Sequence, residues 1–146
     1  MSPVVEPVGK IVVSLSGPLV NPRVIHEAVR FSRLMNSKLH AIHMSLPKAG
    51  ELTMMMDPLR KYSEADLRDH FRLRGYPELA ETIPLKIVKG RNVAKMLKDV
   101  TNGADLLIIG HKHRNRLTAA LATGSIALQI LDVVSCPVMV IPKTAE

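Results

Sequence analysis

The sequence predicts an α/β fold built on a doubly wound parallel sheet. Apolar runs alternate with segments of helical spacing along the chain. Each run is continuously apolar rather than alternately apolar and polar, which is typical of strands buried on both faces. Strands joined through helices form right-handed crossovers, so helices should cover both faces of one parallel sheet.

The expected elements of the first half are two strands and two helices. The strands are predicted at 10–15 and 38–44. A helix at 22–36 would have Asn21 as its N-cap and Pro22 as its first residue. Its apolar face would present Ile25, Ala28, Val29, Ser32 and Met35. A loop from Pro47 to Asp57 leads to a polar helix at about 58–75, which Gly75 can end.

The second half is expected to supply three more strands and two more helices. The strands are predicted at 85–88, 105–109 and 137–141, and Gly90 breaks the first of them. The helix at about 91–102 would present Val93, Ala94, Leu97 and Val100, and the last helix would start near Ser125. The apolar terminal strand 137–141 would form an edge that invites pairing with a second copy.

Size and composition indicate one globular domain. The chain has 146 residues, 47% hydrophobic and 23% charged, so we expect a single domain over 1–146 with 1–9 as an N-terminal arm. No apolar run reaches the roughly 18 residues of a membrane span, and the N-terminus lacks a signal-peptide core. Cys136 is the only cysteine and cannot form an intrachain disulfide. We expect a cytoplasmic protein in which this thiol is buried and inert.

The net charge of +7 favours anionic partners such as nucleotides, acidic proteins or nucleic acid. Aromatic residues are only 3% of the chain, which argues against the stacking surfaces of single-strand nucleic-acid binders. The basic loop 111–116 is interpreted either as an anion-binding lip or as a solvated loop.

Candidate site residues follow the predicted strands, because ligands of such sheets bind at the carboxyl ends of the strands. Gly110 follows the strand 105–109, and Gly124 with Ser125 opens the last helix. Glycine lets a ligand approach the backbone, and a helix N-terminus suits phosphate. The alternative is a turn glycine and an ordinary serine N-cap.

Other chemical groups give no sign of catalysis or metal binding. His40 and His43 are three residues apart in one strand and should lie on opposite faces as packed, hydrogen-bonded histidines. Glu64 and Arg68 are an i, i+4 pair on a solvated helix face. The sequence contains no nucleophile elbow, Walker loop or dinucleotide fingerprint. We therefore expect no metal and no catalytic residue, and at most slow ATP hydrolysis.

The segment Ala104–Pro142 resembles the C-terminal signature of the universal stress protein family. In that signature a strand ending in glycine precedes two residues, a second glycine, nine residues and Gly-Ser or Gly-Thr, and a helix and a Pro-Val strand follow. The segment Lys10–Met44 is also similar, so the resemblance extends from about Gly9 to Lys143. It implies the strand order 3-2-1-4-5 and the three-layer fold of the adenine nucleotide alpha-hydrolases.

The resemblance also implies a ligand, a site and a partner. Gly110, Gly124 and Ser125 match the phosphate and ribose motif, Met44 falls where backbone contacts adenine, and Gly90 falls at the turn near the cleft. The ligand would be ATP or AMP, and the partner a second copy paired through 137–141.

Two residues depart from the family's pattern. Ser16 stands in place of the adenine-side aspartate, and His113 stands in place of the second glycine, with ten residues before Gly124. The expected function is a stress-response regulatory module that binds the nucleotide weakly. The alternative is a dimeric interaction module that binds no nucleotide.

Overall fold

The computed structural model describes residues 9–15, 22–45, 62–89, 93–110 and 134–142. The predicted helix near Ser125, the N-cap Asn21 and the turn at Gly90 lie outside these ranges. The strands are β1 (Gly9–Ser14), β2 (Ser37–Ser45), β3 (Leu85–Lys89), β4 (Leu106–Gly110) and β5 (Val138–Ile141). The helices are α1 (Pro22–Leu34), α2 (Glu64–Leu73), α3 (Pro77–Thr82) and α4 (Val93–Val100).

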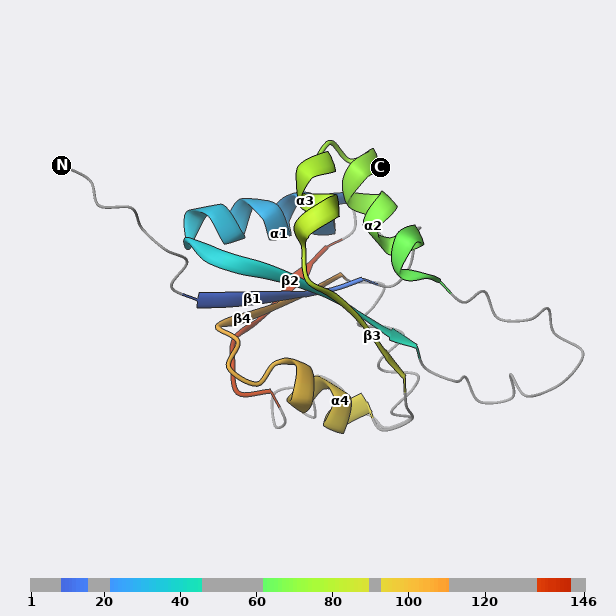
Figure 1. The fold of residues 1–146 in the computed structure, drawn as a ribbon. Helices are drawn as coiled ribbons and strands as arrows, with labels where there is room; N and C mark the ends of the chain where they lie inside the picture. The colour runs from blue at the N-terminus through green and yellow to red at the C-terminus, as the bar shows by residue number, and fades with distance from the viewer. Residues whose placement is uncertain (1–8, 16–21, 46–61, 90–92, 111–133, 143–146) are drawn as a thin grey trace, which may run out of the picture.

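The five strands form one parallel sheet in the order β3-β2-β1-β4-β5, which confirms the predicted topology. Figure 1 shows α1, α2 and α3 over one face of the sheet and α4 on the other. Each face has its own apolar core. The core under α1–α3 includes Ile11, Val13, Leu67, Phe71 and Ile108. The core under α4 includes Val12, Ile42, Met44, Leu97 and Leu107.

Helix α1 buries a narrower face than the sequence predicts. Its buried residues are Val24, Ile25, Ala28 and Val29, whose spacing places them on one side of a helix. Met35, predicted on this face, lies in the turn after the helix and is 39% exposed. The next residue, Asn36, has a positive φ of 48°, a conformation that no helix continues through.

The predicted helix at about 58–75 is wrong at its start, because α2 begins at Glu64, and the prediction lacks the second helix that follows. Tyr62 and Ser63 precede the helix, and Ser63 forms a capping box with Asp66 that fixes its first turn. Gly75 has a positive φ of 99° just after the helix, so the expected end there is confirmed. The sequence reasoning missed α3, which begins at Pro77 as its first helical residue.

The strand that was predicted at 105–109 begins and ends one residue later. Asp105 directly precedes β4 and is hydrogen-bonded to Lys10 at the start of β1. Its backbone N–H donates to the Lys10 carbonyl at 2.8 Å, and its carboxylate accepts from the Lys10 N–H at 2.9 Å. The same carboxylate fills the space that a side chain at Gly9 would need. At the far end, Gly110 is the last residue of β4.

Candidate functional site

The strand order reverses between β1 and β4, and a parallel sheet offers its ligand crevice at such a point. The register aligns the strand ends there. Val13 lies opposite Ile108, so Leu15 is level with Gly110 two residues further on. Ser14 lies opposite Ile42, so Leu15 is also level with His43. Leu15 therefore lies between the carboxyl ends of β2 and β4.

The backbone of Leu15 is held on the β2 side by two hydrogen bonds. Its N–H donates to the Ile42 carbonyl at 2.8 Å, and its carbonyl accepts from Nδ1 of His43 at 2.8 Å. The His43 ring is buried and meets Tyr62 edge to face, with centroids 5.7 Å apart. His43 is thus the packed, hydrogen-bonded histidine that the sequence predicts. Its position beside the crevice was missed, because its bond to Leu15 spans 28 residues.

Met44 and Gly110 are the two predicted site residues that the structure describes. The Met44 side chain is buried in the core under α4, so only its backbone is available at the strand end. Gly110 is also buried, and a Cβ there would be 3.0 Å from Cγ2 of Val24. Its φ is not positive, unlike those of Gly75 and Gly103, so it is not a turn glycine. Gly110 lets the first turn of α1 pack against the end of β4.

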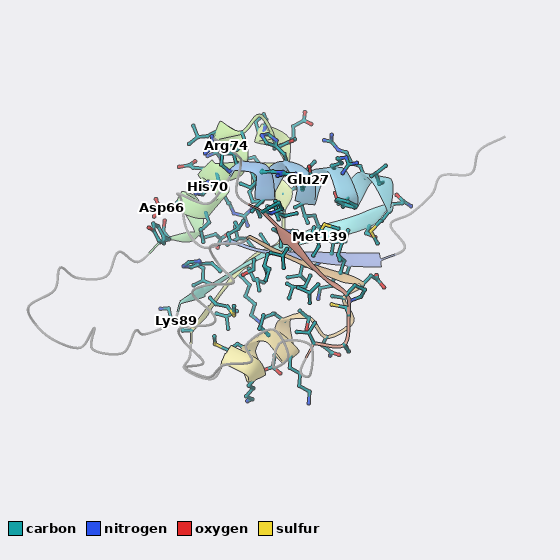
Figure 2. All side chains as sticks on the ribbon, turned by 180° about the vertical axis from the view of Figure 1, so that it is seen from behind. Glu27, Asp66, His70, Arg74, Lys89 and Met139 are labelled. Atoms are coloured by element: carbon teal, nitrogen blue, oxygen red, sulfur yellow. The ribbon has the colours of Figure 1, made fainter. Side chains whose placement is uncertain are left out.

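The other predicted site residues are Ser16, Gly90, His113, Gly124 and Ser125, and they lie outside the described ranges, as does the basic loop 111–116. Lys89 is exposed and ends β3 opposite Ser45, so it brings a cation to the same end of the sheet (Figure 2). No group of three or more potential metal ligands occurs within the described ranges.

Cys136 is buried, as the sequence predicts. Burial raises the pKa of its thiol, and the Asp105 carboxylate raises it further. A thiol with a raised pKa holds less of the reactive thiolate at neutral pH. In the part of the chain that the structure covers, no helix is long and apolar enough to cross a membrane.

The sheet order and the aligned ends of β2, β1 and β4 define a doubly wound α/β protein with its crevice at the β1–β4 reversal. Residues 7–142 match the profile of the universal stress protein family. The chain therefore belongs to that family.

Solved structures share the fold at low sequence identity. A universal stress protein in complex with cAMP is 19% identical with a TM-score of 0.59, over 93% of this chain and 98% of that one. A universal stress protein from Archaeoglobus fulgidus in complex with dAMP is 17% identical with a TM-score of 0.53, over 95% and 99%. UspA from Lactobacillus plantarum is 22% identical with a TM-score of 0.55, over 94% and 99%. No curated protein matched the chain.

Proposed function

We propose that this protein is a regulatory module that binds an adenine nucleotide, ATP or AMP, in the crevice at the carboxyl ends of its strands. The observation that carries the proposal is the alignment of Leu15 with His43 and Gly110 at the reversal of strand order. Two universal stress proteins of this fold were crystallised with adenine nucleotides, cAMP and dAMP.

We place the adenine ring of the ligand at this edge. The backbone of Met44 lies at the end of β2 while its side chain is buried away from the crevice, so a backbone contact to adenine is the interaction it can offer. The phosphates would lie toward Gly110, Gly124 and Ser125, with adenine near Ser16 and Met44. Lys89 adds positive charge at the same edge.

Binding should be weak because the chain departs from the family's pattern at Ser16 and His113. A serine supplies no carboxylate acceptor, and an imidazole adds bulk where the pattern has bare backbone. A lost hydrogen bond of this kind costs about 0.5–3 kcal/mol, or up to about 150-fold in affinity. We therefore expect dissociation constants in the micromolar range or above. The module would work in the cytoplasm as one domain, with at most slow ATP hydrolysis.

The first prediction is that ATP or AMP raises the melting temperature of the protein. At a ligand concentration about 100 times the dissociation constant, binding stabilises the folded state by about 2.7 kcal/mol. For a chain of this length that corresponds to a shift of roughly 5–10 °C. A melting scan against a nucleotide panel measures the shift, and calorimetric titration gives the affinity. The double variant Ser16→Asp, His113→Gly should bind more tightly than wild type.

The matched control for placement is Gly124→Val, which should abolish the shift because it adds bulk at the phosphate motif. If this variant binds as well as wild type, the ligand lies elsewhere. If neither wild type nor the double variant responds to any nucleotide, the alternative function is supported, namely a dimeric interaction module.

The edge strand β5 favours a dimer under either function. In the sheet order it has β4 on one side and no described strand on the other. Val140 on this strand is 36% exposed, and an exposed apolar edge strand is a surface for pairing with another chain. We propose that two copies pair through 137–141.

The second prediction is that the protein has the mass of a dimer in light scattering at micromolar concentration. Val140→Lys should shift the mass to that of a monomer, because a charged residue on an edge strand opposes pairing. The control is Leu73→Lys, which places the same charge on α2 at a leucine that is 78% exposed. A monomeric wild type, or a Val140→Lys variant that remains a dimer, would contradict pairing through this strand.

A further inference from the structure

A second concave region lies at the opposite end of the sheet from the crevice. It is a pocket of about 250 Å³ between the first halves of β1, β2 and β3 and the C-terminal end of α4. Its polar lining consists of Lys10, His40, Lys86 and Asp99. Its apolar lining includes Val12, Ile42 and Val100, which are buried. The pocket is on the α4 face of the sheet, because Asp99 and Val100 of α4 line it.

The strand register explains why cations meet here. Lys10 lies opposite Lys38, and Val12 lies opposite His40. Side chains two residues apart on a strand share a face. Val12 belongs to the core under α4, so Lys10 and His40 lie on the α4 face of the sheet as well. Lys86 joins this face from β3 because it pairs with Ile42.

Two lysines line the pocket, Lys10 and Lys86, and Lys38 lies beside Lys10 on the same face without lining it. Lys10, Lys38 and Lys86 form no ion pair with any residue in the described ranges. Asp99, from α4, is the single acid of the lining. The Asp105 carboxylate accepts from the Lys10 backbone N–H at 2.9 Å, so three ammonium groups and two carboxylates lie at this end of the face, and the local charge is still positive.

We propose that this pocket is a second binding site, which takes a small, multiply charged anion of the phosphate or sulfate class. The volume is below the roughly 300–1,000 Å³ of pockets for drug-sized ligands, so a compact anion suits it better than a whole nucleotide. The ammonium groups of Lys10 and Lys86 in the lining supply the charge, and Lys38 beside Lys10 adds to it. The buried floor lowers the effective dielectric and strengthens their attraction for the anion.

The pKa of His40, which lines the pocket, can report whether an anion is bound there. Burial lowers the pKa of its imidazole, and the positive charges of Lys10 and Lys38 lower it further. The charged groups around it are Lys10 and Lys38, the pocket residues Lys86 and Asp99, and Asp105, whose carboxylate accepts from the Lys10 backbone N–H. An anion bound among the lysines would offset their repulsion and make protonation of His40 easier.

The experiment is an NMR titration of the histidine ring protons with pH, in sulfate and in chloride at equal ionic strength. Sulfate keeps both negative charges across this pH range, and chloride controls for simple screening of the lysines. The His40 signal is assigned by its loss in His40→Gln. We expect the His40 pKa to be higher in sulfate than in chloride, with a saturable dependence on sulfate concentration.

Charge variants test the placement. Lys86→Gln should weaken the apparent sulfate affinity by about two- to fivefold, the range of a single exposed charge contact. Asp99→Asn should strengthen the apparent sulfate affinity, because it removes the negative charge of the one carboxylate in the pocket lining. Lys98→Gln is the matched control, since Lys98 is exposed on the same helix but does not line the pocket. Coincident His40 titrations in sulfate and chloride would overturn the proposal, as would equal effects of Lys86→Gln and Lys98→Gln.

Discussion

Replacing Arg68 with methionine should lower the free energy of unfolding by about 2–4 kcal/mol. The Arg68 guanidinium donates from one nitrogen to the Ala80 carbonyl at 3.0 Å and to the Ile83 carbonyl at 2.8 Å. These carbonyls lie at the C-terminal end of α3, where the last carbonyls of a helix lack intrahelical partners. Each buried acceptor left without a partner costs about 1–3 kcal/mol.

The second contact of Arg68, its ion pair with Glu64, contributes less to the free energy of unfolding. The sequence predicts its i, i+4 pair with Glu64, which the structure confirms at 2.7 Å. That pair is exposed on the Glu64 side, and exposed pairs contribute about 0–1 kcal/mol. The interpretation of this pair as part of a solvated helix face holds for Glu64, whose side chain is 57% exposed, whereas Arg68, at 22%, also joins α2 to α3.

Urea unfolding measures the effect, and Arg72→Met is the control. Arg72 lies one helical turn further along α2 and pairs with Asp69 and Glu81 at the surface. Its loss should cost much less than the loss of Arg68, because water screens its ion pairs. Arg68→Lys should be intermediate, because an ammonium keeps the charge but lacks the separate Nε and Nη2 donors that contact Glu64 while Nη1 holds both carbonyls. Equal losses for Arg68→Met and Arg72→Met would contradict the role of Arg68 as a cap of α3.

The strands and the burial of both their faces could be predicted because they depend on local patterns. Each apolar run is continuous, which requires cover on both faces, and the resemblance to a known family supplied the order. One helix was predicted at about 58–75, with its end at Gly75, and α3 was missed. The signals for two helices were present in the sequence, since Ser63 and Asp66 fit a capping box and Pro77 fits a first helical position.

The contacts at the two sites could not be predicted, because they join residues far apart in the chain. Gly110 needs to be small because Val24 packs against it, and no local pattern pairs these positions. The pocket at the other end depends on the register that sets Lys10 beside Lys38 and Lys86 beside Ile42. In the sequence these lysines are only scattered charges.

Acid should destabilise this protein through His70. The side chain is 3% exposed on the buried face of α2, with Leu67 and Phe71. Neither ring nitrogen has a hydrogen-bond partner among the described residues. Burial, and then the charge of Arg74 just after the same helix (Figure 2), lower the pKa of His70 to about 4, and Asp69 opposes part of this shift.

The direction of the effect follows from proton binding in the two states. The unfolded chain takes up a proton at His70 below about pH 6.5, whereas the folded protein takes it up only below about pH 4. Stability is therefore complete above pH 6.5 and is lost as the pH falls from 6.5 to 4. At pH 4.5 the loss from this one residue is about 2.5 kcal/mol.

Urea unfolding at pH 7.5 and pH 4.5 tests this with His70→Leu. At pH 7.5 the variant should be at least as stable as wild type, because an apolar side chain replaces a buried imidazole without partners. Between the two pH values it should lose about 2.5 kcal/mol less stability than wild type does. The control is His26→Gln, an exposed histidine on α1, which should keep the acid sensitivity of wild type. If His70→Leu loses as much stability as wild type, other groups cause the acid sensitivity, and the buried neutral imidazole does not.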